Sequence, residues 1–369
     1  MTRFITLICA FFLAKAQAAQ PNILFILADD LGYGDVGCYN LQSKVPTPHL
    51  DRLAGEGIRF TDAHSPSTVC TPTRYSVLTG HMAFRLNYRG VFTGVGGPCL
   101  ITNGRLTLPG MLRQQGYETA MFGKWHVGLS AFDKQGKPIH QNGLPAVRRI
   151  DYSRPFVGGP IDRGFDHFFG FDNQGFAHFY YPEFLWRNGE KVLFPKNHDL
   201  RVNGEYRKGA GDYSHDELVK EALSWVRRNR EHPFFLYIPF CIPHAELAVP
   251  EDSIAPYREF GWPEKPRIEG VGNTGGGKDA GYGSQYTRGY CGQSHPHAAY
   301  AGMISRMDRS VGKILDLLEE LHLTRDTFVL FSSDNGPSDE GGQTLRFFKS
   351  SGPLSGHKRS MHEGGLRVP

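Results

Sequence analysis

Residues 22–30 read NILFILADD, and this stretch decides the fold class. The apolar run up to Ala28 has the length and continuity of a strand that is buried on both faces, as the strands of parallel sheets are. Two carboxylates, Asp29 and Asp30, follow it without a break. We therefore expect a buried parallel strand that delivers polar side chains to the edge of a sheet where ligands bind.

Strand-like and helix-like segments alternate along the rest of the chain, which is typical of a parallel sheet covered by helices. The predicted fold is α/β, with a mostly parallel mixed sheet sandwiched by helices. Further strands are predicted at residues 58–63, 117–122, 234–240 and 327–333, and helices from Thr47-Pro48, from about Thr107, from a capping box at 214–217 and over about 297–322.

Two long irregular stretches, about residues 130–160 and 249–295, interrupt the alternation. We expect both to be surface insertions that line or cover the site. The second is rich in glycine, and a flexible linker is the alternative there.

The composition excludes several classes of protein. Of 369 residues, 40% are hydrophobic and 21% charged, which is unlike a disordered chain, a coiled coil or a small disulfide scaffold. The 41 basic and 37 acidic residues give a formal charge of only +4. This excess is too small to indicate a nucleic-acid partner.

Residues 1–18 have the pattern of a signal peptide: Arg3 precedes an apolar run over residues 4–13, and Ala16-Gln17-Ala18 supplies a cleavage pattern. The run is too short to span a bilayer, and no later stretch reaches that length. We expect an exported protein without an integral membrane segment; an uncleaved apolar N-terminus packed in the core is the alternative. Loss of Arg3 and Lys15 would leave 39 basic and 37 acidic residues, a charge of +2.

The cysteines that remain after residue 18 are odd in number, which in an exported protein suggests that one of them has a role other than a disulfide. They are Cys38, Cys70, Cys99, Cys241 and Cys291.

Oxygen ligands follow both the first predicted strand and the last. Asp29 and Asp30 follow residues 22–28, and Asp334 and Asn335 follow residues 327–333. Brought to one sheet edge, these side chains would form a hard oxygen site of the kind that holds Ca²⁺ or Mg²⁺ rather than Zn²⁺. Taken singly, such dipeptides are more often turns and caps.

Cys70 precedes a predicted helix whose first turn contains Pro72, and Arg74 lies one turn further on. Cys70 would then lie at a helix N-terminus, where backbone N–H groups and the helix dipole favour an anion. An ordinary buried cysteine is the alternative.

Four further polar residues complete the candidates. Lys124 and His126 occupy a glycine-bounded loop after a strand, where they could aim a cation and a titratable imidazole at one point. A solvated lysine and a structural histidine are the alternative. His244 after the strand at 234–240, and Lys358, are weak signals in isolation.

These motifs resemble the type I sulfatases. Residues 70–74 with 78–80 match the C-x-P-x-R signature of that family, and residues 116–126 resemble its second signature. Asp29-Asp30, Asp334-Asn335-Gly336 and Lys358 fall in the family's order, so the resemblance runs from about Pro21 to the last residue. Thr68 and Phe122 depart from it, because the family more often has smaller side chains there.

The resemblance implies an alkaline phosphatase-like fold, with residues 19–369 as the sulfatase N-terminal catalytic domain. Similar sulfatases continue beyond the equivalent of Pro369 into the rest of the sheet and a small antiparallel subdomain. We therefore expect a domain whose C-terminal part is incomplete.

The resemblance also implies the chemistry. Cys70 would be converted to formylglycine by a maturation enzyme, and its hydrate would attack the sulfur of a sulfate ester. One divalent ion, expected to be Ca²⁺, would be held by Asp29, Asp30, Cys70, Asp334 and Asn335. Arg74 would hold the hydrate, His126 would act as its base, and Lys124 and Lys358 would neutralise the sulfate. His244 would protonate the leaving alcohol, with His295 and His297 as competing candidates.

The expected substrate is an aryl or carbohydrate sulfate. A phosphonate or phosphodiester hydrolase of the same superfamily is the nearest alternative, and an inactive exported fragment is the alternative that is not an enzyme.

Overall fold

The computed structural model of the chain describes residues 20–88, 90–91, 98–139, 149–172, 174–198, 201–202, 205–206, 211–266 and 290–369. The expected signal peptide lies outside the described residues, as do residues 140–148 of the first expected insertion and 267–289 of the second.

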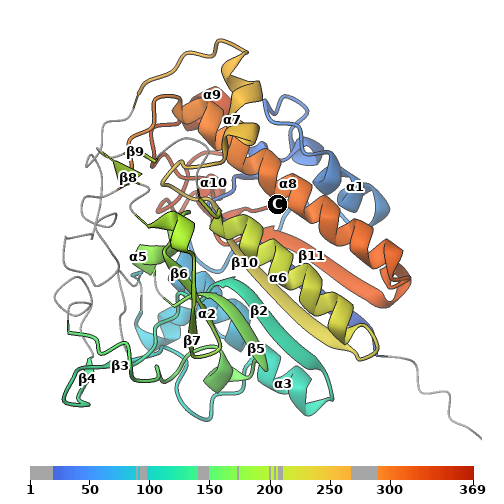
Figure 1. The fold of residues 1–369 in the computed structure, drawn as a ribbon. Coiled ribbons are helices and arrows are strands. Elements are labelled where there is room, and N and C mark those ends of the chain that lie inside the picture. The colour runs from blue at the N-terminus through green and yellow to red at the C-terminus, as the bar shows by residue number, and fades with distance from the viewer. Residues whose placement is uncertain are drawn as a thin grey trace, which may run out of the picture.

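A seven-stranded sheet forms the centre of the molecule, in the order β11-β1-β10-β2-β5-β6-β7 (Figure 1). The first five strands of that order run parallel, and the last two pair antiparallel. The prediction of a mostly parallel mixed sheet is therefore confirmed. The strands are β1 (Asn22–Asp29), β2 (Glu118–Lys124), β5 (His167–Phe171), β6 (Phe184–Arg187), β7 (Glu190–Leu193), β10 (Phe234–Pro243) and β11 (Thr327–Ser333).

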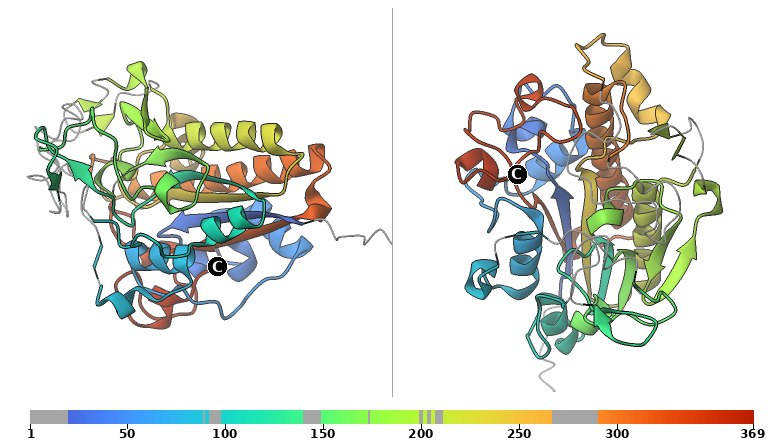
Figure 2. Two further views of the ribbon diagram at one scale, coloured as in Figure 1. Left: turned by 90° about the horizontal axis from the view of Figure 1, so that it is seen from below. Right: turned by 90° about the vertical axis from the view of Figure 1, so that its left-hand side faces the viewer.

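Helices lie on both sides of this sheet, as expected. The amphipathic helices α6 (Ser214–Asn229) and α8 (Pro296–Glu320) run along one face, whereas α2 (Cys70–Thr79) lies on the other (Figure 2). α1 (Pro48–Glu56) packs against α8, and α3 (Leu108–Gln114) against β2. None of the described helices is both long and apolar enough to cross a membrane.

The remaining elements are short. The strands are β3 (Ala131–Phe132), β4 (Pro138–Ile139), β8 (Arg201–Val202) and β9 (Glu205–Tyr206), and the helices are α5 (Gln174–Ala177), α7 (Glu251–Arg258), α9 (Leu345–Phe348) and α10 (Glu363–Leu366). Single 3₁₀ turns lie at Tyr33–Asp35, Gly37–Tyr39, Ala83–Leu86, Ile161–Arg163, Pro195–Asn197 and Thr324–Asp326.

Two local predictions are wrong. Residues 58–63 form no strand; Ile58 and Phe60 are 81% and 64% exposed, and the nearest pairing is a single bridge between His64 and Arg367. A segment that alternates apolar and polar residues becomes a strand only where a neighbouring strand can share its backbone hydrogen bonds. The expected capping box also fails to form, because α6 starts on Ser214 itself and Tyr213 occupies the N-cap without a side-chain hydrogen bond.

Gly123 allows β2 to approach β10 closely just before Lys124. Its φ is +143°, and a Cβ atom there would lie 2.0 Å from the carbonyl oxygen of Pro239. That contact is with backbone, which cannot move aside as a flexible side chain could. The close approach therefore helps to fix where Lys124 leaves the sheet.

Replacing Gly123 with alanine should lower the free energy of unfolding by about 3 kcal/mol, since it combines backbone strain with overpacking. The matched control is Gly55→Ala in α1, where an added Cβ meets nothing within 4 Å. Chemical denaturation of both variants would measure the difference. A Gly123→Ala protein as stable as the control would contradict the argument.

Candidate active site

The carboxyl ends of the parallel strands bring the predicted site residues to one place. Asp29 ends β1, Lys124 ends β2, and His244 directly follows β10. Asp334 and Asn335 directly follow β11, and Cys70 begins α2 beside them. The side chains of all ten predicted site residues are buried: Asp29, Asp30, Cys70, Arg74, Lys124, His126, His244, Asp334, Asn335 and Lys358.

An oxygen-rich cluster lies between β1 and β11. The backbone N–H of Asp30 donates to Asp334 Oδ1 at 3.2 Å, and Asn335 Nδ2 donates to Asp30 Oδ1 at 2.7 Å. Asp29 Oδ1 and Asn335 Oδ1 are buried without a hydrogen-bond partner among the described residues. Since buried polar atoms are normally paired, two orphaned oxygens in one cluster fit a hard cation.

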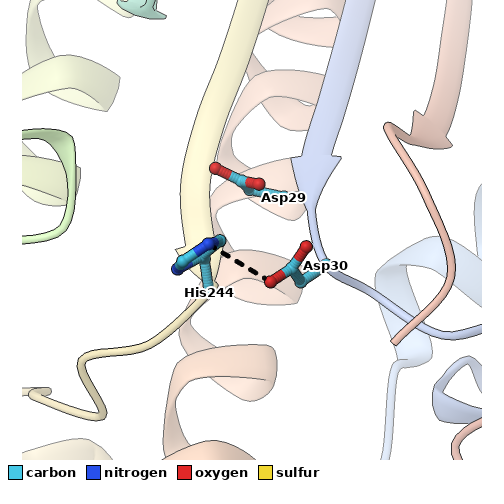
Figure 3. A group of neighbouring side chains, drawn as sticks. All are labelled: Asp29, Asp30 and His244. Carbon is cyan, nitrogen blue, oxygen red and sulfur yellow. Dashed lines mark ion pairs between the residues drawn. The ribbon is translucent and has the colours of Figure 1, made fainter. Parts of the chain in front are cut away.

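Cys70 lies against this cluster. Its sulfur and one carboxylate oxygen each of Asp29 and Asp334 all lie within 4.8 Å of one another. A second such group joins Asp29, Asp30 and His244, which Figure 3 shows converging from the ends of β1 and β10. Burial raises the pKa of the Cys70 thiol to about 11, so an unmodified Cys70 is a poor thiolate nucleophile at neutral pH. No disulfide joins the five cysteines of the described chain.

Two buried cations compensate the carboxylates. Lys124 Nζ lies 2.5 Å from Asp29 Oδ2, and Arg74 donates to Asp334 Oδ2 through Nε at 3.1 Å and through a terminal nitrogen at 2.8 Å. Burial raises the pKa of Asp29, but Lys124 and Arg74 outweigh it and hold that pKa well below its ordinary value. Burial and the neighbouring Asp29 raise the pKa of Asp334 to about 7. Asp29 is therefore the firmly ionised member of the pair.

His126 is linked to Cys70 through Thr71, the next residue of the chain. Its Nε2 lies 3.0 Å from the hydroxyl of Thr71, and its backbone is left-handed, with φ +54°. Asp30 is also left-handed, with φ +66°. Such conformations are uncommon for residues other than glycine and are concentrated at functional sites.

His244 and Lys358 form a second polar unit. Lys358 Nζ donates to Asp30 Oδ2 at 2.7 Å and lies 3.0 Å from His244 Nε2, which is itself 3.4 Å from Asp30 Oδ2 (Figure 3). Burial disfavours the charged form of Lys358, but Asp30 more than compensates and raises its pKa well above the ordinary value. Burial lowers the pKa of His244. The neutral His244 ring therefore accepts a hydrogen bond from the ammonium.

The competing histidines have other partners. His297 Nδ1 lies 2.7 Å from the carbonyl of Pro263, and its Nε2 lies 3.0 Å from Thr344 Oγ1. His295 occupies the N-cap of α8. Of the three candidates, His244 is the one in contact with Asp30 and Lys358.

Three residues of the site were not expected from the sequence. His178 contacts Lys124 and His244, Thr71 contacts His126, and Glu340 Oε2 lies 3.4 Å from Lys358 Nζ. Burial raises the pKa of Glu340, but Lys358 together with His244 and Arg359 outweighs it and brings that pKa to about 2. Position next to Cys70 could have pointed to Thr71, whereas nothing in the local sequence singles out the other two.

Known proteins are similar to this chain in both sequence and fold. An N-acetylgalactosamine-6-O-sulfatase of Bacteroides thetaiotaomicron is 31% identical over 96% of this chain and 67% of its own length, and human steryl-sulfatase is 27% identical over 97% and 63%. The solved structure of Ps i-CgsB in complex with k-i-k-neocarrahexaose matches with a TM-score of 0.66 and 26% identity, over 95% of this chain and 65% of that one. The chain thus spans about two thirds of the length of these relatives.

The sulfatase family model matches residues 21–369, nearly the whole chain. The chain, which gathers carboxylates, cations and Cys70 at the carboxyl edge of its sheet, therefore belongs to the sulfatase family.

Proposed function

We propose that this protein hydrolyses sulfate esters to an alcohol and inorganic sulfate. The observation that carries the proposal is the position of Cys70, at the N-terminus of a ten-residue helix and between an oxygen cluster and buried cations. A formylglycine made from Cys70 by a maturation enzyme would supply a hydrated aldehyde as the nucleophile. Membership of the sulfatase family supports this modification.

A divalent ion, for which we propose Ca²⁺, fits the orphaned oxygens of Asp29 and Asn335. Asp30, Asp334 and the modified Cys70 would complete its ligand set. When bound, such an ion stabilises the ionised form of a hydroxyl and polarises a sulfate oxygen.

The chain's own residues prepare the site for an anion. Lys124 and Lys358 place ammonium groups in a buried site, where their attraction for the sulfate oxygens is stronger than in water. The guanidinium of Arg74 donates hydrogen bonds to Asp334 and to the carbonyl of Lys124. Arg74 therefore holds these two residues in place beside the nucleophile. His126, adjacent to Cys70 through Thr71, would remove a proton from the hydrate.

The leaving alcohol would take its proton from the unit formed by His244 and Lys358. The carbonyl of Ala245 lies 2.5 Å from His244 Nδ1, which places the ring proton on Nδ1 and leaves Nε2 as the acceptor from Lys358. His244 would take up a proton from solvent at Nε2 and donate it to the leaving oxygen once Lys358 Nζ has turned toward the sulfate oxygens.

A sulfated carbohydrate is the substrate class that we propose. The relatives include an N-acetylgalactosamine-6-O-sulfatase, and Ps i-CgsB was solved with a neocarrahexaose. The signal-peptide pattern of residues 1–18 supports a site of action in an exported compartment.

Mass spectrometry of the peptide that contains Cys70 tests the modification. In protein co-expressed with a maturation enzyme, the sulfur of Cys70 should be replaced by an aldehyde oxygen, and hydrolysis of an aryl sulfate should follow the modified fraction. Cys70→Ala should abolish turnover, while Cys99→Ala, which removes a buried cysteine elsewhere, should retain it. A free thiol at Cys70 in fully active protein would refute the mechanism.

The same assay separates the two candidate substrate classes. Faster hydrolysis of an aryl phosphonate than of the aryl sulfate with the same aryl group would favour a phosphonate hydrolase.

Metal removal tests the oxygen cluster. Adding Ca²⁺ at a hundred times its Kd to chelator-treated protein should raise the free energy of unfolding by about 2.7 kcal/mol. Asn335→Ala should lose most of that response. Asp308→Asn, which alters a buried carboxylate that accepts hydrogen bonds from the start of α1, should keep it. Equal responses in all three proteins would show that the ion binds elsewhere.

His244→Ala tests the protonation of the leaving group. Turnover of a sugar or alkyl sulfate should fall about a hundredfold, because general acid catalysis contributes that much or more, whereas an activated aryl sulfate should be much less affected. Comparing kcat for the two substrates gives the result. Equal losses on both would rule out the acid role.

A further inference from the structure

His178 lies between two functional groups of the site without belonging to any motif. It directly follows α5 and is 4% exposed. Its Nε2 lies 3.3 Å from Lys124 Nζ, and its ring is stacked on that of His244, with centroids 3.7 Å apart and planes 20° apart. One side chain thus contacts both the lysine expected to bind the sulfate and the histidine expected to serve the leaving group.

The direction of the hydrogen bond between His178 and Lys124 is fixed by the chemistry of the ammonium group. An ammonium group donates hydrogen bonds and accepts none, so His178 Nε2 must be the acceptor and the ring proton must be on Nδ1. Burial, together with the nearby His244 and Lys124, holds the pKa of His178 well below its ordinary value, in agreement with a neutral ring. Asp29 and His178 then take two of the three N–H groups of Lys124 in the described structure. The third N–H is left for an anion, and its direction is fixed by the other two.

Stacking against His178 restricts the orientation of the His244 ring. The hydrogen bond between Nδ1 and the carbonyl of Ala245 fixes one point of the His244 ring but still allows rotation about that axis. The flat face of His178 at 3.7 Å restricts this rotation and keeps Nε2 directed at Lys358 and Asp30. Tyr290 limits the space around both rings, with centroids 6.0 Å and 6.3 Å away.

We infer that His178 is a positioning residue for sulfate ester hydrolysis: it orients Lys124 by accepting its hydrogen bond and orients His244 by ring stacking. This inference rests on the proposed function. The two contacts use different properties of the imidazole, and two substitutions can therefore separate them.

His178→Phe keeps a flat ring against His244 but cannot accept from Lys124. Losing a hydrogen bond to a charged group should lower kcat about tenfold or more on activated and poor leaving groups alike, because both substrates carry the same sulfate. His178→Gln keeps an acceptor but removes the stacked ring. Its kcat should fall about tenfold on a sugar sulfate and change little on an activated aryl sulfate.

His215 supplies the matched control. It is a buried histidine on α6 with a ring 4.6 Å from Phe240 and a hydrogen bond to Ser310, and it contacts none of the site residues named above. His215→Phe and His215→Gln should show no dependence on the leaving group, whatever their effect on stability. Each variant is first checked by a thermal melt, and each folded His178 variant tests its own contact.

Wild-type turnover of both sulfates establishes the proposed function independently of these variants. The inference is overturned if His178→Gln, like His178→Phe, loses activity by the same factor on both substrates, or if neither variant loses activity. It is also overturned if ¹⁵N NMR of the folded wild-type protein finds the His178 proton on Nε2, a measurement that needs no variant. The inference is supported if His178→Phe loses activity on both substrates, His178→Gln loses it on the sugar sulfate alone, and the ring proton is on Nδ1.

Discussion

The compensation of charge inside the protein is the constraint on which the rest of the site depends. Asp29 is fully buried, and its carboxylate is held by Lys124 at 2.5 Å and by Arg74 at 3.4 Å. Removing such ions from water costs several kcal/mol each, which only close opposite charges and hydrogen bonds can offset. The partners come from β1, β2 and α2, elements far apart in the chain. Any shift of one of them would leave a charge uncompensated, so the network ties the sheet edge to the helix.

The backbone around this network is equally constrained. Asp30 and His126 are in left-handed conformations, and Gly123 lies against a carbonyl of β10. Each of these three backbone conformations costs free energy locally. They persist because the surrounding packing and ion pairs stabilise them by more than that cost. The fold thus arranges these side chains in advance, which would lower the entropy lost on binding the proposed sulfate ester.

Much of this arrangement could be predicted from the sequence, for physical reasons. β1 and β10 can be predicted because parallel strands buried in a sheet are apolar over most of their length. β11 has an equally apolar sequence, although it lies at the edge of the sheet with Phe328 and Leu330 exposed. The ends of these three strands place Asp29, Asp334 and His244 at one edge. At residues 58–63, Ile58 and Phe60 alternate with polar residues as in a half-buried strand, but no strand of the described structure pairs with them. Whether such a partner exists is decided by the whole fold and not by the local sequence.

The same distinction explains the missed residues. His178 meets Lys124 across 54 positions, and Glu340 meets Lys358 across 18. His178 and Glu340 lie in no periodic pattern and no motif. Their contacts depend on which segments of the folded chain meet in space, which the local sequence does not reveal.

The charges of the described site also bear on which esters it can accept. Asp29, Asp30, Asp334 and Glu340 face Arg74, Lys124 and Lys358, and Arg359 pairs with Glu340 at 2.8 Å, so the formal charges of these side chains cancel. A divalent ion in the oxygen cluster would give the site an excess of positive charge, which favours an anionic ester over a neutral one. Sulfate monoesters and phosphonate monoesters both carry one negative charge, whereas a phosphate monoester carries nearly two at neutral pH. Net charge alone therefore does not separate these three esters. The choice among them must come from contacts with the atoms around sulfur or phosphorus, where we propose that Lys124 and Lys358 act.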